Sequence, residues 1–128
     1  MVVGEKTPEF AKKKVLSIRQ LDSVSRSRLL DDLAGVNLVE ASLGILDIAR
    51  VAADRVTGIS VAFLVCGTSV TLGDLRAASV QFAAGVEVVV VVCDPESVPG
   101  LRRVAGLTIL TIGHLADLTA SLARSVNA

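Results

Sequence analysis

The sequence is poor in aromatic residues: its 128 residues include three phenylalanines and no tryptophan or tyrosine. Proteins that bind single-stranded nucleic acid without sequence preference stack the bases on aromatic side chains, so this shortage argues against that class. The formal net charge is zero, which gives no long-range attraction to nucleic acid or to an anionic membrane surface. We therefore predict no nucleic-acid partner.

Cysteine and histidine are also scarce, with two cysteines and one histidine. The first 15 residues contain no long apolar run, so we expect no signal peptide and predict a cytoplasmic protein whose thiols stay reduced. The longest strongly apolar run covers residues 88–93, whereas a membrane-spanning helix needs about 20 such residues. We therefore predict no transmembrane segment.

Familiar ligand-binding motifs are missing too. The sequence has neither GxGxxG nor GxxxxGK[ST], which weakens a nucleotide-binding hypothesis. The segment that starts at Asp22 approaches the DxSxS pattern of metal-ion-dependent adhesion sites, but Val24 stands where that pattern needs serine. We predict no cofactor, and an enzymatic activity is not favoured.

The chain does have a large aliphatic content, since 52% of its residues are hydrophobic. Its length fits a single domain, and we predict a basic N-terminal arm over residues 1–25 followed by one α/β domain over 26–128. Residues 1–28 carry seven basic and three acidic side chains. This excess indicates a solvated arm or, alternatively, a weak contact surface for an anionic partner. A strand could form at 15–21.

Apolar spacing and capping residues predict the secondary structure of the domain. Helices are expected over 25–33, over 45–56, between Thr71 and Gly85, over 94–106 and from His114 onward. Apolar runs predict strands at about 59–66, 86–93 and 107–112.

The strands begin 27 and then 21 residues apart, which is enough chain for one crossover between parallel neighbours in each case. The expected fold is therefore a three-layer α/β arrangement with at least three parallel strands and flanking helices.

Ligands of parallel sheets bind beyond the carboxyl ends of the strands, so we look for a site there. A metal site is one hypothesis, because thiolates and imidazole suit zinc. Buried cysteines and helix-capping residues are the alternative explanation. Asp94 with Glu96 could pair as carboxylates, but Asp94-Pro95 also suits a helix start. The candidate ligand-binding residues are Thr68, Ser69, Asp94 and His114, and the alternative metal ligands are Cys66, Cys93 and His114.

Three segments carry a family resemblance: SRSRLLDDLAGV, LRAASVQFAAGVEVVVVVCDP and PGLRRVAGLTILTIGHLADL. Residues 26–123 resemble the C-terminal part of the von Willebrand factor A-like domain in a bacterial family of uncharacterised membrane-anchored proteins encoded beside MoxR-type ATPases. The family's transmembrane helices and its metal-site motif are not in this sequence. The resemblance implies half of a von Willebrand A-like or Rossmann-like sheet without the metal site. Two origins remain open: a short homologue, or the tail of a longer ancestral protein.

Half a sheet would leave the strand at 59–65 as an exposed edge, where another strand can pair. Residues 15–21 could fold onto this edge, or two copies of the chain could pair there. We therefore predict a noncatalytic protein-interaction module whose partner is a second copy or a MoxR-type ATPase. The alternative is a small ligand- or metal-binding protein or enzyme that uses the strand ends.

Overall fold

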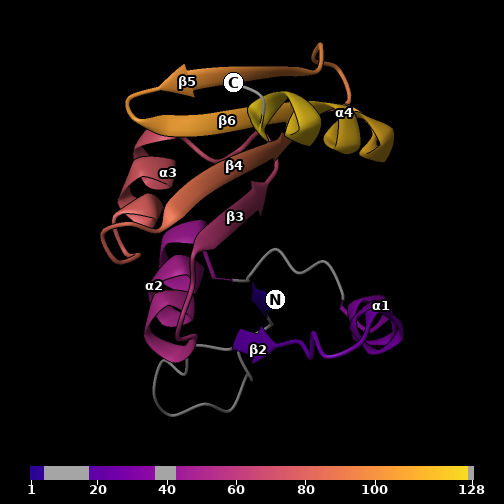
Figure 1. Cartoon of the computed structure of the whole chain (residues 1–128), viewed down its shortest axis with the longest axis vertical. Helices are drawn as coiled ribbons and strands as arrows, with labels where there is room; N and C mark the ends of the chain where they lie inside the picture. Colours follow the sequence, from indigo (N-terminus) through magenta and orange to yellow (C-terminus); the bar gives the residue numbers. More distant parts are fainter. Residues whose placement is uncertain (5–17, 37–42, 127–128) are drawn as a thin grey trace.

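The computed structural model describes residues 1–4, 18–36 and 43–126, which form an α/β arrangement (Figure 1). A four-stranded sheet in the order β3-β4-β6-β5 lies beside a two-stranded antiparallel ribbon, β1-β2. The strands are β1 (Val2–Gly4), β2 (Ile18–Gln20), β3 (Val61–Cys66), β4 (Glu87–Cys93), β5 (Gly100–Val104) and β6 (Leu107–Ile112). The helices are α1 (Arg26–Ala34), α2 (Ile45–Arg55), α3 (Leu72–Ser79) and α4 (Leu115–Val126).

The three predicted parallel strands are confirmed. β4 pairs in parallel with β3 on one side and with β6 on the other. Three consecutive valines in the middle of β4, residues 89–91, are buried, because helices cover both faces of the sheet at this strand. A β-branched run of this kind suits a central strand whose two faces both pack against a core.

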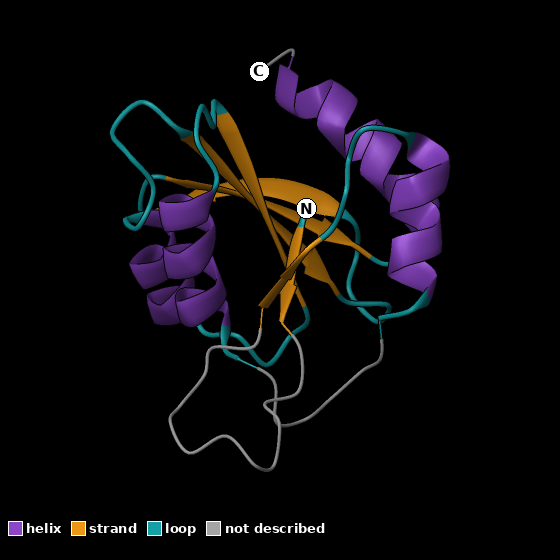
Figure 2. Cartoon of the chain, turned by 90° about the horizontal axis from the view of Figure 1, so that it is seen from below, coloured by secondary structure: helices purple, strands orange, loops and turns teal. Residues whose placement is uncertain are grey.

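Helices lie on both sides of the sheet (Figure 2). On one face, α2 and α3 supply Ala49, Leu75 and Ala78 to a core that includes Leu64 of β3 and Val90 of β4. On the other face, α4 lies over β6 and β5. This second core consists of Val89, Val91, Leu110 and Ile112, with Leu118 and Leu122 of α4 packed against it.

The predicted helix over 94–106 is wrong, since this segment forms a loop and strand β5. Asp94 starts the loop by accepting a hydrogen bond from the Glu96 N–H, and Pro99 lacks the N–H that a helix interior needs. β5 then pairs antiparallel with β6 through the two-residue turn Ala105-Gly106. Both turn residues have positive φ, as a type I′ hairpin turn requires. The second crossover therefore contains a strand instead of a helix.

The predicted strand at 15–21 is present in part, as β2, but it does not complete the main sheet. β2 pairs with β1, so in the described residues the alternative in which this segment folds onto the β3 edge is not found. Residues 15–17 lie outside the described residues. Leu21, which follows β2, is buried and donates its N–H to the Met1 carbonyl. This bond continues the pairing of the two segments one residue beyond β2.

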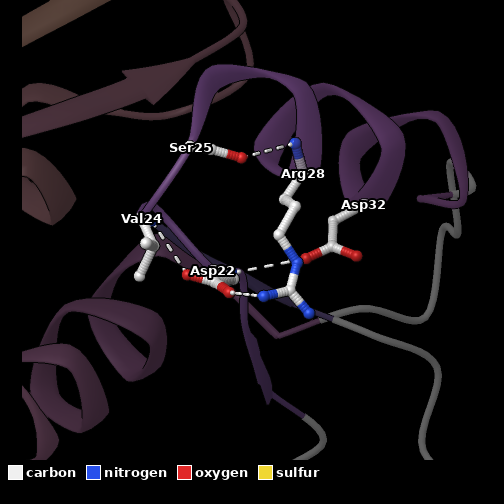
Figure 3. A network of polar contacts seen from close by, with 5 residues as sticks. All are labelled: Asp22, Val24, Ser25, Arg28 and Asp32. Carbon is white, nitrogen blue, oxygen red and sulfur yellow. Dashed lines mark hydrogen bonds and ion pairs between the residues drawn. The ribbon is translucent and has the colours of Figure 1, made fainter.

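The segment around Asp22 starts α1 (Figure 3). The Asp22 carboxylate accepts a hydrogen bond from the Val24 N–H and forms an ion pair with Arg28 at 3.3 Å. Ser25 caps the helix by accepting from the Arg28 N–H, so the helix predicted over 25–33 begins one residue later, at Arg26. These contacts give the near-match to DxSxS a structural role at a helix start.

Candidate functional site

The edge strand β3 exposes a stripe of apolar side chains. Val61, Phe63 and Val65 are 45%, 52% and 62% exposed, whereas Ala62 and Leu64 between them are buried. In the strand register Phe63 lies beside Val89, so the stripe is on the sheet face that α4 covers further along. The coverage by α4 does not reach β3, and the stripe stays accessible.

The same three residues direct their backbone polar groups to the open side of β3. The Glu87 N–H donates to the Ser60 carbonyl at 3.0 Å, so Ser60 faces β4. Backbone groups of successive strand residues point to alternate sides, and Ala62 and Leu64 therefore face β4 as well. The N–H and C=O groups of Val61, Phe63 and Val65 point outward, ready to pair with another strand.

The two edges of the sheet differ in chemistry. The other edge strand, β5, follows Pro99 and carries Arg102 and Arg103, and such residues discourage edge-to-edge association. β3 contains no charged residue, proline or glycine. The protection that β5 has against pairing is therefore absent from β3.

The β1-β2 ribbon lies on the β3 side of the sheet in both overall views (Figures 1 and 2). It contacts α2 but is not hydrogen-bonded to β3 as a strand. Within the described residues, the outer side of β3 has no strand partner.

A cavity of about 560 Å³ lies against the opposite sheet face, between α3 and the β5-β6 hairpin. Thr68, after β3, and Asp94, after β4, both line it. Two of the four predicted ligand-binding residues thus meet at one cavity. Ser69 is exposed and is not among the lining residues.

His114 lies at the start of α4, away from the cavity lining. The backbone N–H of His114 donates to the Asp117 carboxylate at 2.8 Å, and the Gly113 backbone N–H donates to the same oxygen at 3.1 Å. Asp117 thus satisfies two amide groups that the helix start leaves without an internal partner. In these contacts His114 takes part through its backbone N–H, which Asp117 binds at the start of α4.

The two cysteines lie on opposite faces of the sheet, because Cys66 is in register with Val92 and Cys93 with Ile112. Burial, and to a smaller extent the neighbouring Cys93, raise the pKa of the Cys66 thiol. In the described residues, no three histidine, cysteine or acidic side chains gather into a group that could hold a metal ion. The alternative set Cys66, Cys93 and His114 therefore does not form a metal-binding cluster here.

The thiols should differ in reactivity. With iodoacetamide near neutral pH, we expect Cys93 to be alkylated several-fold faster, because it is exposed while Cys66 is half-buried with a raised pKa. Raising the pH should accelerate Cys66, since its thiolate forms only at higher pH. Intact-mass spectrometry of the wild type and of Cys93→Ser measures both rates. Equal rates would contradict this assignment.

The start of α3 adjoins the cavity, and side chains of this helix start already accept hydrogen bonds from its N–H groups. The Thr71 hydroxyl accepts from the Asp74 N–H, and the Asp74 carboxylate accepts from the Thr71 N–H and hydroxyl. This confirms the predicted cap and completes a capping box. A helix start that already holds a carboxylate is a poor site for a phosphate.

Comparisons with protein-family models, with curated proteins and with solved structures find no match to this chain. The family resemblance thus stays a prediction from sequence patterns. In the described portion of the chain, no helix combines the length and the apolar character that crossing a membrane requires.

Proposed function

We propose that this protein is a noncatalytic protein-interaction module that pairs with a second copy of itself through β3. The observation that carries the proposal is the coincidence of three features on Val61, Phe63 and Val65. These residues are apolar, their side chains are exposed, and their backbone polar groups face the open edge. Strand addition at such an edge is a common mode of protein recognition.

A second copy fits this edge because the strand is complementary to itself. When two β3 strands run antiparallel with Phe63 opposite Phe63, Val61 of each copy lies opposite Val65 of the other copy. All three opposed pairs are then hydrogen-bonded pairs, which use every outward N–H and C=O of these residues. The two apolar stripes also fall on the same face of the joined sheet.

The resemblance to the von Willebrand A-like family extends the proposal. The chain then corresponds to the C-terminal half of such a sheet, or of a Rossmann-like one, and a MoxR-type ATPase is an alternative partner. The sequence patterns and the parallel strands β3, β4 and β6 support this relation. A cytoplasmic setting is supported by the two cysteines, which are both free.

Two double variants test the self-pairing register. Val61→Lys/Val65→Lys places lysine opposite lysine, whereas Val61→Lys/Val65→Glu places lysine opposite glutamate at the same positions. Opposite charges across a strand pair stabilise it and like charges destabilise it. We expect the wild type to dimerise in sedimentation experiments. The Lys/Glu variant should dimerise about tenfold or more tightly than the Lys/Lys variant.

Val80→Lys is the matched control, because Val80 is 74% exposed but lies after α3, away from the edge. It should dimerise as the wild type does. A wild type that stays monomeric from micromolar to millimolar concentration rules out self-pairing. Equal behaviour of the two double variants rules out the antiparallel register. Adding a purified MoxR-type ATPase to the same assay shows whether the edge binds that partner instead.

A further inference from the structure

The cavity between α3 and the β5-β6 hairpin is a second feature, independent of the β3 edge. Its volume of about 560 Å³ lies in the range of small-molecule sites. α2 and α3 cover this face over β3 and β4, and Ile109 of β6 is buried in the same core, so the cavity lies between α3 and the outer part of the β5-β6 hairpin. Aliphatic residues dominate the lining on this face: Val70, Leu72, Leu75, Val92, Val98, Val104 and Ile109.

Arg102 supplies a positive charge to this apolar cavity. In the register of β5 and β6 it lies opposite Ile109, and both residues line the cavity. Neighbouring Arg103 lies opposite Thr108, so it belongs to the other face of the sheet. Within the described part of the chain, no hydrogen bond or ion pair occupies the Arg102 guanidinium. Its donors are therefore available to a bound anion.

The acidic residue of the cavity, Asp94, lies at the end away from Arg102. The Asp94 N–H donates to the Ile112 carbonyl, which places Asp94 at the carboxyl end of β6. Ile112 is three residues beyond Ile109, or roughly 10 Å along the strand. The Asp94 carboxylate accepts from the Ser97 hydroxyl and the Glu96 N–H, and these bonds lower the pKa of Asp94. Over such a distance, solvent and salt screen its repulsion of an anion at Arg102.

The lining also limits the class of ligand. Among the described residues that line it, none has an aromatic side chain on which a nucleobase could stack. The nearby α3 start is occupied by the Asp74 carboxylate and does not favour a phosphate. What remains is an aliphatic surface with one available guanidinium, which pairs well with a carboxylate.

We propose that this cavity binds a small aliphatic carboxylate, with the carboxylate on Arg102 and the hydrocarbon chain over Val92, Val70 and Leu72, which line the cavity and are not fully buried. Octanoate is the probe. Arg102→Gln removes the charge and keeps much of the side-chain length. Arg103→Gln makes the same change one residue away, on the other face of the sheet, and is the matched control.

Isothermal titration calorimetry should show octanoate binding to the wild type and to Arg103→Gln. Binding to Arg102→Gln should be about tenfold or more weaker, because a charge-assisted pair is lost. Along the series butanoate, hexanoate and octanoate, affinity should rise about fourfold per methylene group if the chain is buried. Amide shifts in nuclear magnetic resonance spectra should locate the probe at Val92 and Thr111.

Several results would overturn the proposal. These are no binding of octanoate to the wild type, equal binding to both arginine variants, and binding of octanol as tight as that of octanoate. An affinity that does not grow with chain length would contradict burial of the chain. None of these outcomes depends on pairing at β3, because the probe occupies the opposite face of the sheet.

Discussion

Leu110→Ala is expected to destabilise the fold by about 3–5 kcal/mol, the range of large-to-small changes at well-packed core positions. Leu110 has 0% exposure at the centre of β6, between Val91 of β4 and Leu101 of β5. α4 covers it from above, so the surrounding structure has little freedom to collapse into the cavity. The loss is a large share of the roughly 5–15 kcal/mol that stabilises a typical domain.

Urea denaturation followed by circular dichroism measures this loss. Leu115→Ala is the matched control, because Leu115 is the first residue of α4 and is 80% exposed. It should change stability by no more than about 0.5 kcal/mol. If the two variants lose similar amounts, α4 does not pack on β6 as described.

The central part of the fold could be predicted because local signals and the global arrangement agree there. β6 was predicted over its full observed range, and β4 within one residue at its start. In both strands aliphatic residues dominate, and both faces of the sheet are buried around them. The starts of α1 and α3 were predicted for a related reason. Ser25 and Thr71 satisfy amide groups within three residues, so the sequence contains the whole interaction.

The segment 94–106, predicted as a helix, forms a loop and strand β5 because its local signals fit both structures. Asp94-Pro95 is compatible both with a helix start and with a turn, and only the residues beyond it decide between them. Pro99 and the following hairpin turn were the available signals. Ala105 was harder to foresee, since a non-glycine residue with positive φ is uncommon. The pairing of β5 with β6 stabilises this turn, and pairing across the sheet is not visible in local sequence.

For the same reason, some residues of the candidate sites could be predicted from the sequence and others could not. Thr68 and Asp94 follow strands, so the rule about strand ends found them. Arg102 and Phe63 lie within strands, and their importance depends on which helices pack over each sheet face. α4 packs over β6 and β5 and leaves Phe63 of β3 exposed. An alternating strand pattern alone does not distinguish Phe63, which is exposed, from Leu64, which is buried.

Ser121→Ala is expected to stabilise the protein, which is unusual for a change at a fully buried position. The Ser121 side chain has 0% exposure in α4, and its hydroxyl has no hydrogen-bond partner among the described residues. An unsatisfied buried hydroxyl costs about 1–3 kcal/mol, and alanine removes it while leaving only a small void. Alanine also favours the helix by a few tenths of a kcal/mol. We expect a gain of about 1–2 kcal/mol after the loss of packing is included.

Thr119→Ala separates the two contributions, because Thr119 is exposed on the same helix and gains only the helix propensity of alanine. In thermal and urea denaturation, Ser121→Ala should gain clearly more than Thr119→Ala. A loss of stability in Ser121→Ala would mean that the hydroxyl does have a hydrogen-bond partner. If the gain is observed, combining Ser121→Ala with the β3 double variants compensates for any stability that the new surface charges cost. Such chains would stay folded while their pairing is measured, since the α4 position and the β3 edge are independent sites.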